Sequence, residues 1–74
     1  MEIKRIATLA EAKGGPTLDI CETRPGHFLL TIVQRGDRLI YGAFASGPLA
    51  EEQGLTLARR YRMDPVHILL SEAI

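Results

Sequence analysis

Three short runs between Thr17 and Ala45 have apolar side chains on both faces when they are read with the two-residue period of a strand. The run 28–34 places phenylalanine, leucine and isoleucine on one face, and leucine, threonine and valine on the other. The run 38–45 is largely apolar on both faces as well. An antiparallel sheet with one face in water alternates more cleanly. The pattern therefore predicts a sheet that is covered on both faces.

Two short turns separate these runs and set their order. Arg24, Pro25, Gly26 and His27 join the first run, 17–23, to the second. The segment 34–37 joins the second run to the third, and its glycine and aspartate tolerate the backbone angles of a tight hairpin. The sequence predicts a three-stranded antiparallel meander. The first run is mixed and charged, which predicts that it forms an edge strand.

A helix is predicted after the meander. Ser46 is the expected N-cap, and Pro48 suits the first helical positions. Glu51 and Glu52 follow near the predicted N-terminus, where the helix dipole stabilises negative charge. A stripe at helical spacing follows, made of Ala50, Gly54, Leu57, Ala58 and Tyr61. Gly54 indicates either close contact with the sheet or a break between two shorter helices.

The last ten residues are predicted to form a second helix. Asp64 and Pro65 give a start signal. Helical spacing then links the apolar residues Val66, Leu69, Leu70, Ala73 and Ile74. A strand over Val66–Leu70 is the alternative, because periodicity does not assign so short an apolar run.

Two alternatives stay open for residues 1–13. Ile3, Ile6, Ala7 and Ala10 fit a helical stripe, and a short strand from Glu2 to Ala7 followed by a helical turn fits equally well. Thr8 and Glu11 have the spacing of a capping box, which favours the second option. The predicted fold class is α+β, with the meander followed by one or two C-terminal helices and preceded by a strand or short helix.

The size of the chain bears on its oligomeric state. Its 74 residues form one predicted domain, residues 1–74, and a chain of this length buries only about 60% of its unfolded surface. Cys21 is the only cysteine, so no disulfide within the chain adds stability. Association of small domains is a common alternative source of stability. We therefore expect a homodimer.

The sequence also gives an expectation about membrane association and cellular compartment. No apolar run approaches the length that spans a bilayer, and the N-terminus has no signal-type segment. The expected location is the cytoplasm, which fits a single reduced cysteine.

An arginine cluster provides the alternative function. Arg59, Arg60 and Arg62 lie at the end of the predicted helix, and together with Arg35 and Arg38 they would contact the phosphates of DNA. The formal net charge is zero, whereas a dedicated nucleic-acid module has a basic excess. A solvated helix end, whose cations favour the dipole, is the simpler interpretation.

No residue pattern points to an enzyme, a cofactor or a small-molecule substrate. Cys21, His27 and His67 match no zinc-ligand spacing. The acidic residues Asp19, Glu22, Glu51 and Glu52 are expected to be solvated, and Gly14 and Gly15 precede no phosphate-binding lysine. We therefore expect no catalytic, metal or cofactor residues.

The remaining interpretation is a protein-interaction module, whose expected partners are a second copy of itself or another protein. Tyrosine is enriched at interface hot spots, and unpaired apolar residues favour burial. The predicted interface residues are Tyr41, Phe44, Tyr61 and Ile74.

Overall fold

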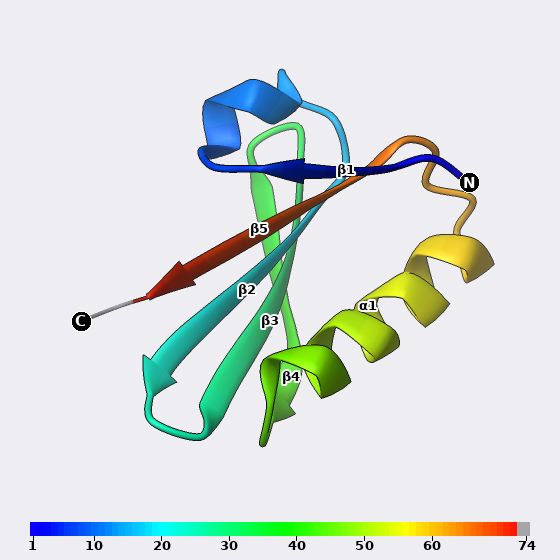
Figure 1. The fold of residues 1–74 in the computed structure, drawn as a ribbon. Helices are drawn as coiled ribbons and strands as arrows, with labels where there is room; N and C mark the ends of the chain where they lie inside the picture. The colour runs from blue at the N-terminus through cyan, green and yellow to red at the C-terminus, as the bar shows by residue number, and fades with distance from the viewer. Residues whose placement is uncertain (73–74) are drawn as a thin grey trace.

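A computed structural model describes residues 1–72 as a five-stranded mixed sheet with one α-helix (Figure 1). The strands lie in the order β1-β5-β2-β3-β4. β1 and β2 both run parallel to β5, and β3 and β4 continue antiparallel. The elements in chain order are β1 (Ile3–Ile6), the 3₁₀ helix η1 (Leu9–Ala12), β2 (Thr17–Arg24), β3 (His27–Gln34), β4 (Asp37–Phe44), α1 (Gly47–Arg60) and β5 (Val66–Glu72).

The predicted meander is confirmed as β2, β3 and β4. Two-residue loops join these strands, Pro25 and Gly26 in the first hairpin, and Arg35 and Gly36 in the second. Both residues of the second loop have positive φ, 54° and 84°, which is the geometry that matches the twist of hairpin strands. Asp37, which the sequence analysis placed in this turn, is the first residue of β4.

The predicted C-terminal helix is wrong, and its alternative is confirmed. Residues Val66–Glu72 form β5, an interior strand that lies between β1 and β2. Val66, His67, Ile68 and Leu69 are all buried. A central parallel strand is covered on both faces and reads as a continuous apolar run, so consecutive apolar residues at 68–70 gave accidental helical offsets. The α-helix therefore lies between strands of the sheet.

The predicted edge position of the first run is also wrong. β2 has β5 on one side and β3 on the other. Its charged Asp19 is accommodated by polar neighbours, since the carboxylate accepts from the hydroxyl of Ser71 at 3.3 Å and lies 3.4 Å from the guanidinium of Arg38. Polar partners on β5, the neighbouring strand, and on β4, the strand after next, let a charged residue occupy an interior strand.

The helix α1 is confirmed, and it continues through Gly54. The Ser46 hydroxyl oxygen accepts from the backbone N–H of Leu49 at 3.2 Å and so caps the first turn. Gly54 lies against the sheet, where an added Cβ would be 2.9 Å from Cδ1 of Leu18. The close-contact interpretation of this glycine is therefore confirmed, and the break is not seen.

The core lies between α1 and one face of the sheet. It contains the buried residues Leu18, Ile20, Leu30, Ala50, Ala58, Met63, Val66 and Ile68. α1 contacts β2, β3 and β4, and it starts beside the end of β4 and ends at the loop that leads into β5 (Figure 1). Within residues 1–72 no helix has the length and apolarity needed to cross a membrane.

The N-terminal segment follows the second of its two predicted forms, a short strand and then a helical turn. The Glu11 carboxylate accepts from the backbone N–H groups of Thr8 at 2.7 Å and Ala7 at 2.8 Å. These bonds lower the pKa of Glu11, because they stabilise its charged form. η1 packs at one end of the sheet face opposite α1, where Ala12 is buried.

Candidate interaction surface

The strand β4 is a long, apolar and exposed edge of the sheet. Among residues 1–72 it pairs only with β3, so alternate backbone N–H and C=O groups along its eight residues have no partner in the sheet. Leu39, Ile40 and Tyr41 are 64%, 65% and 47% exposed. Consecutive large apolar residues on an unpaired edge are the features that favour pairing with another strand.

A bulge at Tyr41 changes which face each residue of β4 uses. Leu30 pairs with Gly42 and Thr31 pairs with Ile40, so Tyr41 is the extra residue. Strict alternation along β4 would put Phe44 and Ile40 on the same face, whereas the bulge puts them on opposite faces. Phe44 pairs with Phe28 and packs against the core on the α1 face, whereas Ile40 lies on the opposite face.

An open groove separates β4 from the C-terminal half of α1. Its apolar walls come from β4, α1, the segment that follows α1, and Ile32 of β3, and it is also lined by Pro16 and by the polar residues Gln34, Arg62 and Asp64. The apolar residues are Ile32, Leu39, Tyr41, Leu57, Tyr61 and Met63. Tyr61 is 66% exposed beside it. We call Leu39, Ile40, Tyr41 and Tyr61 the β4 surface, because these four exposed side chains surround the edge strand.

The opposite edge of the sheet has different properties. β1 has four residues, and its two central ones are Lys4 and Arg5. Arg5 donates to Glu51 of α1 at 2.6 Å, and this ion pair raises the pKa of Arg5. A short and charged edge strand discourages pairing. Of the two edges, only β4 has the length and the apolar side chains that favour pairing with another strand.

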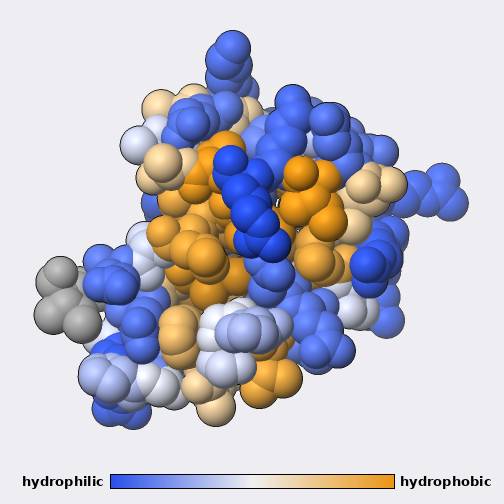
Figure 2. All heavy atoms as spheres, in the orientation of Figure 1, coloured by the Kyte–Doolittle hydropathy of each residue, from blue (hydrophilic) through white to orange (hydrophobic). Residues whose placement is uncertain are grey.

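Further apolar residues are exposed away from β4. They are Met1 before β1, Ile3 in β1, Leu49 at the start of α1, and Leu70 on β5. Figure 2 shows apolar atoms in the middle of the face that is seen in Figure 1, on both sides of a narrow hydrophilic strip. This area has no unpaired strand of comparable length beside it.

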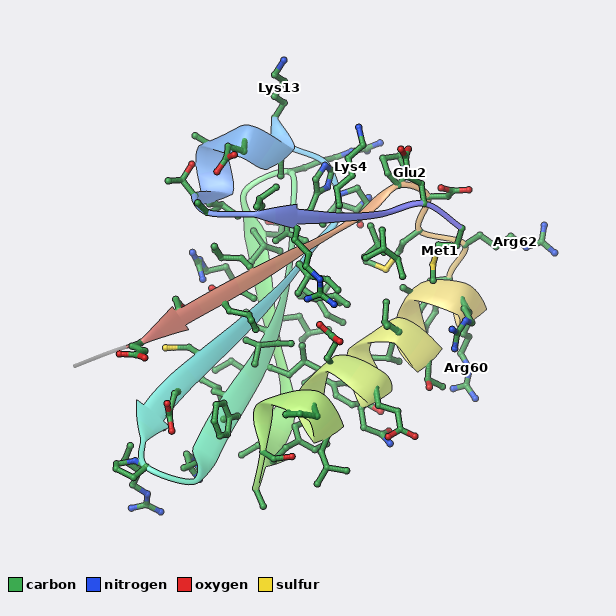
Figure 3. The ribbon with its side chains drawn as sticks, viewed as in Figure 1. Met1, Glu2, Lys4, Lys13, Arg60 and Arg62 are labelled. Carbon is green, nitrogen blue, oxygen red and sulfur yellow. The ribbon has the colours of Figure 1, made fainter. Side chains whose placement is uncertain are left out.

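The predicted arginine residues lie at one end of the molecule. Arg35 is in the β3–β4 turn and Arg38 is the second residue of β4. The end of α1, with Arg59 and Arg60, and the following Arg62 lie at the same end of the sheet. Figure 3 shows Arg60 and Arg62 directed outward from this end of α1. Asp37 and Asp64 lie among these cations.

The candidate metal ligands do not come together. Cys21 lies opposite Ser71 and His67 lies opposite Thr17, so four residues, or about 13 Å of strand, separate them. His27 begins β3. No three His, Cys, Asp or Glu side chains of residues 1–72 are grouped as metal ligands. His67 is buried, and its Nδ1 donates to the carbonyl oxygen of Pro16 at 3.0 Å.

Two of the four predicted interface residues belong to the β4 surface. Tyr41 and Tyr61 line the same groove, whereas Phe44 is partly buried against the core and Ile74 lies outside the described residues. Sequence reasoning did not single out Leu39 and Ile40, because an apolar strand residue is normally assigned to the core. The charged pair Asp37 and Arg38 at the start of this run was the available signal of an exposed strand.

Comparison with known proteins adds no assignment, since no protein-family model, curated protein or solved structure matches the chain.

Proposed function

We propose that this chain is a small non-enzymatic protein-interaction module that acts as a homodimer and associates through the β4 surface. The observation that carries the proposal is the exposed apolar edge strand beside an apolar groove. Pairing satisfies backbone groups along the strand, and apolar side chains around it supply the hydrophobic gain. A chain of this size also gains stability by association.

The proposal includes a reducing compartment, and the cytoplasm is the natural choice. Cys21 is free and partly exposed on the sheet face opposite α1. Such a thiol persists where disulfides are kept reduced.

Light scattering over a wide range of protein concentration tests this function. The expected result is a mass near twice the 8.2 kDa of the chain at high concentration, with dissociation on dilution. A monomer at every concentration contradicts the proposal. A mass that grows without limit also contradicts it, because a two-fold contact closes and uses each β4 surface once.

DNA binding is the second candidate, and the gathering of Arg35, Arg59, Arg60 and Arg62 at one end is the observation that favours it. The same scattering experiment includes a short random DNA duplex at low and high salt. A complex that dissociates as salt rises would support phosphate contacts. We expect no such complex, because acidic residues lie among these arginines and the net charge is zero.

A further inference from the structure

The two ends of the molecule carry opposite charge. The β3–β4 turn, the end of α1 and the N-terminal segment form the basic end, which holds seven of the nine basic residues against four acidic ones. The basic residues are Lys4, Lys13, Arg35, Arg38, Arg59, Arg60 and Arg62, and the acidic ones are Glu2, Glu11, Asp37 and Asp64. Figure 3 shows Lys4, Lys13 and Arg62 at this end.

The other end, around the β2–β3 turn and the start of α1, is acidic. It carries four acidic residues and the basic residue Arg24, and the guanidinium of Arg5 reaches one of the four, Glu51, from β1. The acidic residues are Glu22, Glu51, Glu52 and Glu72. A zero net charge therefore conceals a molecule with two oppositely charged ends, which favours association in opposite orientations.

The strand β4 runs from the basic end to the acidic end, because it starts at the β3–β4 turn and leads into α1. Two copies of β4 that pair antiparallel must place the basic end of each copy beside the acidic end of the other. A parallel pair would place like charges together, which is unfavourable. The charge distribution thus selects both the partner and its orientation.

We propose that the occupant of the β4 edge is a second copy of this chain, paired antiparallel about a two-fold axis near Ile40 and Tyr41 to form a continuous ten-stranded sheet. This inference rests on the proposed function and specifies its geometry. The two α1 helices then lie antiparallel on one face of the joined sheet. The two grooves merge into one apolar valley, which Leu39, Tyr41 and Tyr61 of both copies fill.

Cysteine cross-linking tests the orientation, with Cys21 replaced by serine in every variant. Ile40→Cys places a thiol on an exposed residue near the proposed axis, where cross-strand Cα atoms are about 4.5–5.5 Å apart. Asp37→Cys places it at the end of the strand, where antiparallel partners are separated by roughly 20 Å. We expect mild oxidation to convert most Ile40→Cys protein, and little Asp37→Cys protein, to covalent dimer.

Charge reversal gives an independent test. Arg60→Glu removes attraction to the partner's acidic end at both symmetric positions, and we expect the dissociation constant to rise roughly tenfold. Adding Glu52→Arg to that variant restores opposite charges and should recover most of the loss. Lys4→Glu is the matched control, because it makes the same charge change at the same end but on β1, at the opposite edge of the sheet from β4; the dimer should be affected far less.

The outcomes separate this geometry from the proposed function. A dimer that cross-links equally at both positions, or at Asp37 alone, overturns the antiparallel pairing and leaves self-association intact. If Arg60→Glu leaves the dissociation constant of the dimer unchanged, the charged ends have no role in pairing. A monomer at every concentration overturns both the geometry and the function. Circular dichroism of each variant confirms that the fold is retained.

Discussion

Gly54 shows how a single residue sets the distance between the helix and the sheet. An alanine Cβ would lie 2.9 Å from Cδ1 of Leu18, which is fully buried. Alanine improves helix propensity by about 1 kcal/mol, but overpacking a filled core costs about 1–3 kcal/mol. We expect Gly54→Ala to lower the free energy of unfolding by about 1 kcal/mol in urea titrations.

A second substitution identifies the cause of this loss. Leu18→Val removes the methyl group that approaches Gly54, so Gly54→Ala should be neutral or slightly stabilising in that background. An equal loss in both backgrounds would show that crowding against Leu18 is not responsible. The sequence left a helix break as the alternative at Gly54, because the residue on the facing strand is known only from the fold.

The Glu11 carboxylate links stability to pH. Its bonds to the backbone of Thr8 and Ala7 lower its pKa, so the folded state favours the charged form. This contribution is complete above the ordinary pKa of glutamate and is lost as the pH falls through the lowered value. We expect Glu11→Gln to lower the Tm at neutral pH, with the difference from the unaltered protein narrowing in acid.

Glu52→Gln is the control for that pH dependence. Glu52 is exposed on α1, and within the described residues its carboxylate makes no hydrogen bond comparable to those of Glu11. If lowering the pH narrowed the Tm difference from the unaltered protein equally for both variants, the assigned role of Glu11 would be contradicted. The Thr8 and Glu11 spacing was readable from the sequence, because a capping interaction depends only on neighbours in the chain.

Among the elements, the meander and α1 were predictable, and β5 was not. Hairpins and caps are local, so Gly36 and Ser46 mark them directly in the sequence. β5 depends on neighbours that lie far away in the chain, since His67 pairs with Lys4 on one side and Thr17 on the other. Its apolar run satisfied helical and strand patterns equally well, and the tertiary pairing decided between them.

Two alanine substitutions in β5 distinguish these alternatives in solution. The predicted helix would bury Leu70 in its stripe and leave Ile68 outside, whereas in β5 Ile68 is 1% exposed and Leu70 is 61% exposed. We expect Ile68→Ala to lower the free energy of unfolding by about 3 kcal/mol. Leu70→Ala should change it by no more than about 0.5 kcal/mol. The reverse order, measured by denaturant unfolding, would contradict the strand.

For the whole molecule, association should appear in the thermal stability. A dimer that forms only from folded chains makes the Tm rise with protein concentration. We expect this dependence to be present in the unaltered protein and absent in Ile40→Lys, which puts a charge in the middle of the β4 surface. Leu70→Lys is the matched control, since a similarly exposed residue on β5 changes in the same way.

If the Tm of Ile40→Lys rose with protein concentration as it does in the unaltered protein, association through β4 would be contradicted. The sequence predicted a sheet covered on both faces and a homodimer, but it did not locate the apolar residues of β4 that are exposed in the single chain. β4 is an edge only because β5 enters the sheet beside β2 and not beside β4. Strand order of this kind depends on the arrangement of all five strands, and local periodicity does not encode it.

The interior position of β5 also determines when the sheet can finish pairing as the chain is synthesised. β1 leaves the ribosome first, yet its only neighbour in the described sheet is β5, some sixty residues later in the chain. Until β5 emerges, β1 and one side of β2 have no strand to pair with. We therefore expect the meander and α1 to form first, from contacts between neighbours in the chain, and β5 to pair with β1 and β2 in a later step.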